Sequence, residues 1–460
     1  MESTPPGTRK EPPCHSASHI LERLRQDQSA HLAPEAIQQA CRKQKYTWRR
    51  RLLDPVTTIY LFLLQILHGN TSCQHVVHFG CWTFTDSASC QARKRLPLRV
   101  YHHLLEQTAA AVRQASAEDW RWFSHRVWVV DGSSFSMPDT PELPAAFGQP
   151  TNPRPGCGFP VAKWLALFDV GTGMLLRSAT APLRSHEMSQ CGAISDDLEP
   201  GDIVMGDRGL CSYAHLALLV AGSLHGLFRV HQKQIVDFTP GRPRATRREF
   251  TSAAGLPHSR WVRAQGDSDQ IVIWYKPKKK PVWISEEEYA ALPAEITVRE
   301  LRYRVESPGF RVGEVTVVTT LLDAAAYPAE EVARLYFRRW LVEINFKHIK
   351  ITMKMDVLNC QTVEGVLKEL AMFALVSNLV RSVTTESARA QGVAPERISV
   401  VDTIRWLIGP EADGDVTVLV VNPVRPGRVE PRVVKRRPKQ YFRMTEPRAV
   451  LRKKLPMKGL

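Results

Sequence analysis

The chain of 460 residues carries 62 Lys and Arg against 46 Asp and Glu, so its formal net charge at pH 7 is +16. Hydrophobic residues make up 43% and charged residues 23%, which excludes a largely disordered chain. The longest unbroken apolar run, residues 370–376, falls far short of the ~20 residues of a membrane span, and the N-terminus lacks the apolar core of a secretory signal. We therefore expect a cytoplasmic protein of two to four domains that does not contact a membrane, at about 100–200 residues per domain.

The positive charge is concentrated at the C-terminus. Residues 425–460 contain thirteen Lys and Arg against two Glu, which is most of the net charge of the whole chain. A basic tail of this kind predicts a polyanionic partner, most often nucleic acid. A tail that is only solvated is the alternative.

The first part of the chain has a helical pattern over residues 18–68, and Pro55 is expected to begin a second helix that ends near Gly69. Residues 42–51 within it contain six cations, with Tyr46 and Trp48 between them. Cations neutralise phosphates and aromatic rings pack on sugars or bases, so this segment predicts DNA binding. A solvated surface with a half-buried Trp48 is the alternative. The expected DNA contacts are Arg49, Arg50 and Arg51.

The pattern changes to strands at residue 127. An apolar run over residues 127–130 ends in Asp131, and a strand over residues 202–206 ends at Asp207. The expected order is a strand at 127–132, a hairpin at 163–170 and 174–181, a helix at 186–198, a strand at 202–206, a helix at 212–221 and a strand at 226–231. This is the order of a ribonuclease H-like core, in which Asp131 and Asp207 come from neighbouring strands. A generic α/β fold is the alternative.

Residues 238–317 alternate in short strands with many prolines and cations, which predicts a β-rich insertion. The helical pattern returns at Pro328, which is followed by two glutamates in the first turn. We expect one helix from there to residue 353. At about 100° per residue, four side chains fall within an arc of ~60°. These are Tyr336, Arg339, Glu343 and Lys350, with Lys347 near the edge of the arc. The alternative is a solvated face on which Arg339 and Glu343 form a weak pair.

The spacing Tyr-x2-Arg-x3-Glu-x6-Lys of these four residues resembles the signature of the insertion-sequence-four family of bacterial DDE transposases. The resemblance covers most of the chain. It includes residues 84–87 (FTDS), 130–133 (VDGS), 206–209 (GDRG) and 319–323 (TTLLD).

The resemblance implies a ribonuclease H-like catalytic domain whose carboxylates are Asp131, Asp207 and Glu343. Attack on a DNA phosphodiester needs an oxygen nucleophile, neutralised phosphoryl oxygens and a stabilised leaving oxygen, and two metal ions about 3.5–4 Å apart supply all three. Hard cations prefer oxygen ligands, so the expected cofactor is two Mg²⁺ ions with Mn²⁺ as a substitute.

The resemblance also implies roles in DNA binding. Tyr336, Arg339 and Lys350 are expected to grip phosphates beside the scissile bond, with Lys347 next to them. In relatives a flipped base stacks on an aromatic side chain of the insertion, and Trp274 is the candidate here, with Trp261 and Trp283 as rivals. A Trp in an alternating strand is also a common core residue.

We therefore expect a cut-and-paste transposase that acts as a homodimer in a synaptic complex, through hairpin ends. Its partners would be transposon-end DNA with inverted repeats and target DNA. The alternatives are a nuclease that only nicks and a catalytically inactive DNA-binding protein derived from a transposase. The expected regions are a mainly helical DNA-binding region (1–122), the first part of the core (123–237), the β-rich insertion (238–317), the second part of the core with Glu343 (318–423) and the basic tail (424–460).

Overall fold

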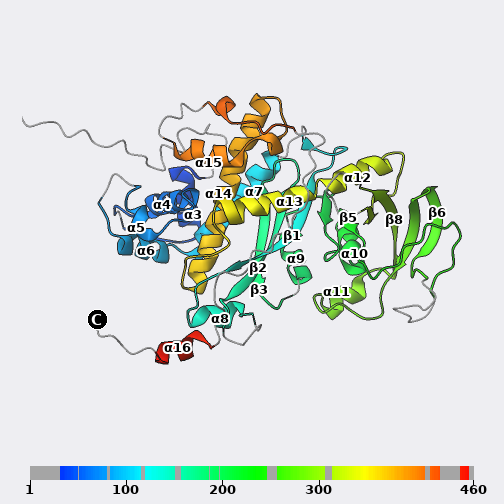
Figure 1. Cartoon of the computed structure of the whole chain (residues 1–460), viewed down its shortest axis with the longest axis horizontal. Coiled ribbons are helices and arrows are strands. Elements are labelled where there is room, and N and C mark those ends of the chain that lie inside the picture. Colours follow the sequence, from blue (N-terminus) through cyan, green and yellow to red (C-terminus); the bar gives the residue numbers. More distant parts are fainter. Residues whose placement is uncertain are drawn as a thin grey trace, which may run out of the picture. The chain divides into compact units, whose positions relative to one another are not determined.

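A computed structural model of the chain has mixed α/β architecture with one nine-stranded sheet in the part that it describes (Figure 1). The predicted α/β class is confirmed. The described residues are 32–49, 51–79, 83–115, 120–150, 157–185, 187–195, 197–245, 256–305, 313–409, 415–424 and 446–454. Within them, no helix is long and apolar enough to cross a membrane.

The chain forms two compact units. The helical unit comprises Met1–Ala111 and Lys347–Asn422, and the sheet unit comprises Val112–Phe346 and Pro423–Leu460. Each unit is therefore assembled from segments far apart in the sequence. The expected domain limits stay predictions, and the limit at residue 317 falls inside a strand, Glu314–Thr319.

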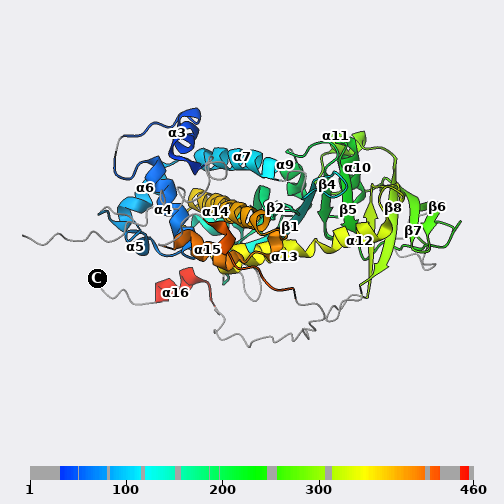
Figure 2. The ribbon, with the colours of Figure 1, turned by 90° about the horizontal axis from the view of Figure 1, so that it is seen from above.

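The strands of the sheet unit are arranged in the order β3-β2-β1-β4-β5-β9-β8-β7-β6. The first three form an antiparallel meander, and β4 and β5 continue from β1 in parallel. The bounds of this half are β1 Val127–Ser136, β2 Val161–Asp169, β3 Leu175–Pro182, β4 Ile203–Gly206 and β5 His225–Arg229. A crossover helix, α10 (Tyr213–Ala221), joins β4 to β5 and lies beside β5 (Figure 2).

The other half of the sheet is antiparallel. It consists of β6 Arg260–Gly266, β7 Asp269–Tyr275, β8 Glu295–Arg304 and β9 Glu314–Thr319. Because β9 pairs with both β5 and β8, the strands expected in an insertion extend the same sheet. Shorter helices complete this unit: α8 Glu142–Phe147, the 3-10 turn Glu187–Gln190, α9 Cys191–Ser195, α11 Glu286–Ala291 and α16 Arg448–Lys454.

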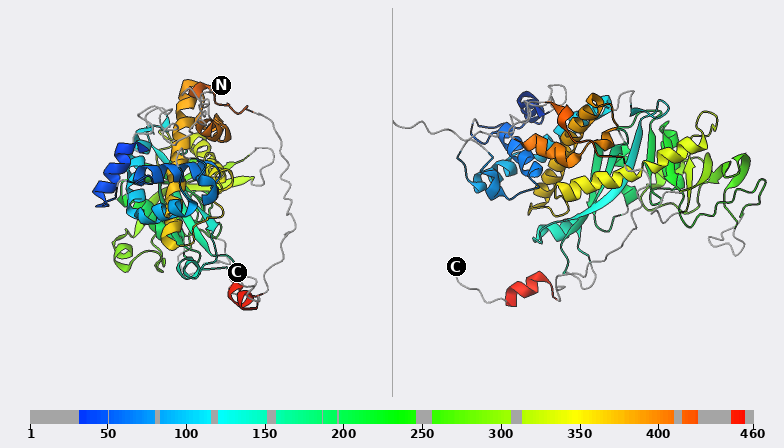
Figure 3. Two further views of the ribbon diagram at one scale, coloured as in Figure 1. Left: turned by 90° about the vertical axis from the view of Figure 1, so that its left-hand side faces the viewer. Right: turned by 45° about the horizontal axis from the view of Figure 1, so that its top comes forward.

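The helical unit is built around two apolar helices. In α4 (Pro55–Leu67) every residue from Ile59 to Leu67 is buried, and Asp54 caps its N-terminus by accepting a hydrogen bond from the Thr57 N–H at 2.8 Å. The start predicted at Pro55 is confirmed. The long α14 (Val363–Ala390) packs beside α15 (Val400–Ile408) (Figure 3). The remaining elements are α3 Pro34–Lys43, α5 Cys73–Val76, α6 Asp86–Arg95, most of α7 Leu98–Ala115 and the 3-10 turns Pro395–Arg397 and Val416–Val418.

The helix expected from residue 328 to residue 353 is not continuous, and this prediction was wrong. The segment forms α12 (Ala329–Phe337), α13 (Trp340–Lys347) and a π-helical turn, His348–Thr352. The break between α12 and α13 falls at Arg338 and Arg339, so it lies within the predicted signature.

Candidate active site

Asp131 and Asp207 lie on neighbouring strands just beyond the residues through which the two strands pair: Asp131 within β1 and Asp207 directly after β4. In the parallel pair of β1 and β4, Val129 is opposite Met205, and each aspartate follows two residues later. The first four residues of β1 are buried, and its burial decreases from Asp131 onward. The Gly209 N–H donates to the Asp207 carboxylate at 2.8 Å and holds it in a turn. The apolar run therefore places Asp131 directly after the fully buried first part of β1.

A tight turn between α12 and α13 carries the rest of the candidate site. The Arg338 N–H donates to the Leu335 carbonyl and the Arg339 N–H to the Tyr336 carbonyl, each at 3.0 Å. Bonds to the third preceding residue tighten the helix relative to the α form. A sequence pattern with helical spacing continues unchanged through such a turn, which is why the break was not predicted.

Tyr336 is buried, and its hydroxyl donates to the carbonyl of Gly206 at 3.2 Å. Burial raises the pKa of Tyr336 far above its usual range, so the phenol stays protonated and remains a donor. The side chain ties α12 to the end of β4, directly before Asp207. This placement is that of a positioning residue and does not support the expected phosphate contact.

Arg339 approaches two of the three expected catalytic carboxylates. Its Nη1 atom lies 3.7 Å from Asp131 Oδ2 and 3.9 Å from Glu343 Oε1. The side chains of Asp131 and Arg339 are 18% and 17% exposed, while Glu343 is 49% exposed. The guanidinium thus lies in the same partly buried place as the carboxylates that were predicted from separate motifs.

The pKa of Asp131 is raised to about 7. Burial is the main cause, and the nearby Glu343 and Asp207 carboxylates raise it further. A hydrogen bond from the Gly132 N–H, at 2.8 Å, and the Arg339 guanidinium act in the opposite direction. Burial together with the two neighbouring carboxylates therefore outweighs the stabilisation of the ionised form by Arg339 and the Gly132 N–H.

The donor chemistry of this site fits a divalent cation. Three carboxylates offer the oxygen ligands that Mg²⁺ prefers, and their mutual repulsion is the kind that a cation relieves. In the arrangement seen here, however, no three His, Cys, Asp or Glu side chains of the described residues are placed to hold a metal ion. Arg339 is the cation that already approaches both Asp131 and Glu343.

A fourth carboxylate beside the site was not predicted. A Cβ atom on Gly132 would lie 2.9 Å from the carboxyl carbon of Glu187, so the backbone next to Asp131 is in close contact with this side chain. The Nζ atom of Lys163 lies 3.9 Å from Glu187. Glu187 belongs to a short 3-10 turn, and no spacing in the sequence connects it with Asp131.

The other basic residues predicted to contact DNA lie in the helical unit where the structure describes them. Lys347 ends α13 and Lys350 lies in the π-helical turn, both in the helical unit. Arg49 and Arg51 are exposed in the same unit, while Arg50 and residues 425–445 and 455–460 of the expected tail lie outside the described residues.

Trp274 is buried in β7, where its indole N–H donates to Glu300 Oε1 at 2.8 Å. This is the core placement that was the alternative to base stacking. The candidate rested on the family resemblance, and β7 offers no outward face for the ring, since all of its residues except Tyr275 are buried.

Residues 122–379, more than half of the chain, match the family model described as the transposase DDE domain. The chain belongs to the DDE transposase family. It is 28% identical over 376 residues to the transposase InsG for insertion sequence element IS4 of Escherichia coli (strain K12), with 77% of each chain covered. The predicted membership of the insertion-sequence-four family is confirmed.

Among solved structures, this transposase is similar to the cryo-EM structure of a piggyBac transposase synaptic complex with hairpin DNA. The TM-score is 0.44 at 9% identity, with 86% of this chain and 79% of that chain covered. Membership of the transposase family implies an enzyme that cleaves DNA, and the family generally uses divalent metal ions.

The raised pKa of Asp131 predicts how stability depends on pH without metal. Unfolding would return the group to about 3.9. Below pH ~4 the carboxyl is protonated in both the folded and the unfolded state, so it does not change the free energy of unfolding. As the pH rises from there towards about 7, the carboxyl ionises in the unfolded state but stays protonated in the folded state, and the free energy of unfolding decreases. Asp131→Asn should therefore raise the melting temperature by at least about 2 °C at pH 8 and by less at pH 4.5.

The measurement is thermal unfolding in buffer with a chelator at the two pH values. Asp267→Asn, the same change at an exposed aspartate in the turn between β6 and β7, is the control and should have little effect at either pH. An equal shift for Asp131→Asn at pH 4.5 and pH 8 would contradict the assignment.

Proposed function

We propose that this transposase cuts the DNA at the ends of an insertion sequence and joins them to target DNA by phosphoryl transfer at Asp131, Asp207 and Glu343. The observation that carries the proposal is that Arg339 approaches both Asp131 in β1 and Glu343 in α13, while the charges of Glu343 and Asp207 both act on Asp131. Asp207 directly follows β4, the strand parallel to β1. The strand order β3-β2-β1-β4-β5, antiparallel and then parallel, supports a ribonuclease H-like core.

Asp131, Asp207 and Glu343 would hold two Mg²⁺ ions, with Mn²⁺ as a substitute. Bound there, the ions would supply neutralisation of the phosphoryl oxygens and stabilisation of the attacking and leaving oxygens. Asp131 would give up its proton when a cation binds, because its pKa is raised by burial and by like charges that the cation offsets.

The proposed chemistry is a sequence of displacements at phosphorus. The oxygen of a water molecule bonds to phosphorus and the bond to the 3′ oxygen breaks; the water releases a proton to solvent and the leaving 3′ oxygen takes one up. The resulting 3′-OH then displaces a 3′ oxygen of the opposite strand, which closes a hairpin. A second water molecule then bonds to the phosphorus at the hairpin tip, and the bond from that phosphorus to the 3′ oxygen of the element breaks; this oxygen takes up a proton and is a free 3′-OH again. The 3′-OH finally bonds through its oxygen to a phosphorus of target DNA, where a 3′ oxygen of the target leaves and takes up the proton. No oxidant or further reactant is needed.

Arg339 would contact the phosphate beside the scissile bond. Its planar guanidinium can donate two parallel hydrogen bonds to phosphoryl oxygens. Once cations compensate Asp131 and Glu343, the guanidinium is available for this contact. Lys347 and Lys350 would add charge contacts to the same DNA, with Arg49 and Arg51 in the helical unit.

The partners of the active protein would be transposon-end DNA with inverted repeats, target DNA and a second copy of the chain in the synaptic complex. The protein would act in the bacterial cytoplasm. A nicking-only or inactive DNA-binding derivative is the alternative.

The carboxylates can be tested by cleavage. Asp131→Asn, Asp207→Asn and Glu343→Gln should each lower Mg²⁺-dependent cleavage of DNA carrying the element's own inverted repeats by at least about a hundredfold, because each removes a charged oxygen ligand. Glu330→Gln, at an exposed position in α12, is the control and should cleave like the parent. If the three variants cut as well as the parent, the assignment is wrong; if the parent nicks without joining, the nuclease alternative holds.

The phosphate contact can be tested by binding. Arg339→Gln should weaken binding to end DNA by about tenfold or more and make the affinity less dependent on salt, because one phosphate contact is lost. Arg334→Gln is the matched control, since Arg334 lies on the exposed side of α12 and pairs with Glu330 and Glu331. Fluorescence anisotropy over a salt titration measures both. If the parent and Arg339→Gln show the same affinity and the same dependence of affinity on salt concentration, Arg339 does not contact the DNA.

A further inference from the structure

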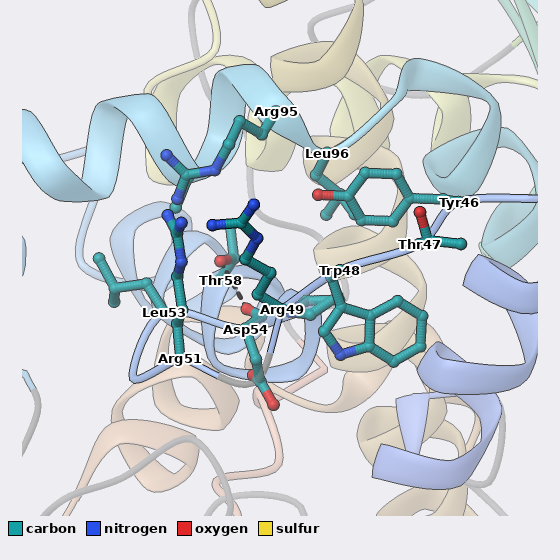
Figure 4. Close-up of a pocket in the computed structure, with 12 residues that line it drawn as sticks. Tyr46, Thr47, Trp48, Arg49, Arg51, Leu53, Asp54, Thr58, Arg95 and Leu96 are labelled. Carbon is teal, nitrogen blue, oxygen red and sulfur yellow. Dashed lines mark hydrogen bonds between the residues drawn. The ribbon is translucent and has the colours of Figure 1, made fainter.

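A cavity of about 210 Å³ lies in the helical unit, between the segment that follows α3 and the end of α6 (Figure 4). The segment leaves α3 through Lys45, whose φ of 53° is left-handed, and the Tyr46 N–H donates to the Cys41 carbonyl at 2.9 Å. This turn ends the helix and directs Tyr46 and Trp48 to one wall of the cavity. At the other end of the segment, Asp54 caps the N-terminus of α4.

The cavity gathers positive charge. It is lined by Arg49 and Arg51 from the segment and by Arg95 from the last turn of α6, and the guanidinium groups of Arg51 and Arg95 point toward each other (Figure 4). None of the three pairs with a carboxylate of the described residues. The one carboxylate in the lining, Asp54, accepts the capping hydrogen bond from Thr57. Like charges so close together favour an anion between them.

The same cavity has an aromatic wall. The rings of Tyr46 and Trp48 are half-buried and stacked, with centroids 6.2 Å apart and an interplanar angle of 19°. The charge of Arg95 acts on the phenol of Tyr46, so the cations and the rings are adjacent. Arginines for phosphate beside aromatic rings for bases are the combination that single-stranded nucleic acid requires.

We propose that this cavity binds one unpaired nucleotide of a DNA strand, with its phosphate at Arg49, Arg51 and Arg95 and its base against Trp48. A duplex would offer phosphates to the arginines but would leave the rings unused, because paired bases stack on one another. The volume is below the about 300–1,000 Å³ of pockets for larger ligands and suits a group of nucleotide size or smaller. The inference rests on the proposed action on DNA and specifies the form of DNA that the helical unit holds.

The test measures the binding of the full-length protein to a labelled single-stranded thymidine oligonucleotide of about ten nucleotides and to a blunt duplex. A chelator is present throughout, so that no cleavage is required and a failure of the catalytic assignment leaves the result interpretable. The variants are Trp48→Ala, Trp48→Phe and Arg95→Gln. Lys94→Gln is the matched control, since it removes one charge from the exposed neighbour of Arg95 on α6, outside the cavity lining.

We expect Trp48→Ala and Arg95→Gln each to weaken single-strand binding by about tenfold or more, while Trp48→Phe and Lys94→Gln stay within about threefold of the parent. Trp48→Ala should leave duplex binding within about threefold. Either of two results would overturn the proposal: an equal loss for Arg95→Gln and Lys94→Gln, which indicates general electrostatics, or unchanged single-strand binding in Trp48→Ala. Because Arg95 is exposed, the comparison of Arg95→Gln with Lys94→Gln keeps the proposal falsifiable if Trp48→Ala does not fold.

Discussion

The candidate site depends on the electrostatic coupling of Asp131, which is partly buried, to the carboxylates of Glu343 and Asp207. Burial and the charges of Asp207 and Glu343 raise the pKa of Asp131 to about 7, so the group resists ionisation. Arg339 approaches Asp131 and Glu343 with a single nitrogen atom and is the nearby cation that offsets part of this cost. We propose that a divalent cation relieves this repulsion when it binds, so that metal binding and the ionisation of Asp131 are coupled.

The backbone around the site serves this arrangement. The register of β1 and β4 brings Asp131 and Asp207 to one edge, and the tight turn between α12 and α13 presents Arg339 and Glu343. The hydroxyl of Tyr336 joins the two parts at the carbonyl before Asp207. A helix that continued without a break would satisfy the same sequence spacing but would not need this anchor. The residues of the signature therefore span the tight turn between α12 and α13 as well as supplying side chains to the site.

The sequence was informative where a local pattern has one physical solution. The apolar run before Asp131 predicted the buried first part of β1, and Pro55 predicted the start of α4. The sequence was uninformative where the burial or the contacts of a side chain depend on residues far away in the chain. Trp274 is buried because β7 is flanked on both sides, and Glu187 contacts Gly132 across a loop of no fixed spacing. The helical periodicity of the sequence does not reveal the break near Arg339, because side chains in a short tight turn keep nearly the same spacing as in an α-helix.

The central claim is that Asp131, Asp207 and Glu343 bind a divalent cation that offsets their repulsion. The most direct measurement is a Mn²⁺ titration followed by electron paramagnetic resonance, which counts the free ion, on the parent protein and on variants that lack one carboxylate. We predict that Asp207→Asn and Glu343→Gln each bind Mn²⁺ at least about tenfold more weakly than the parent, while the exposed control Glu330→Gln binds it equally well. Equal Mn²⁺ affinity in all four proteins would contradict the account.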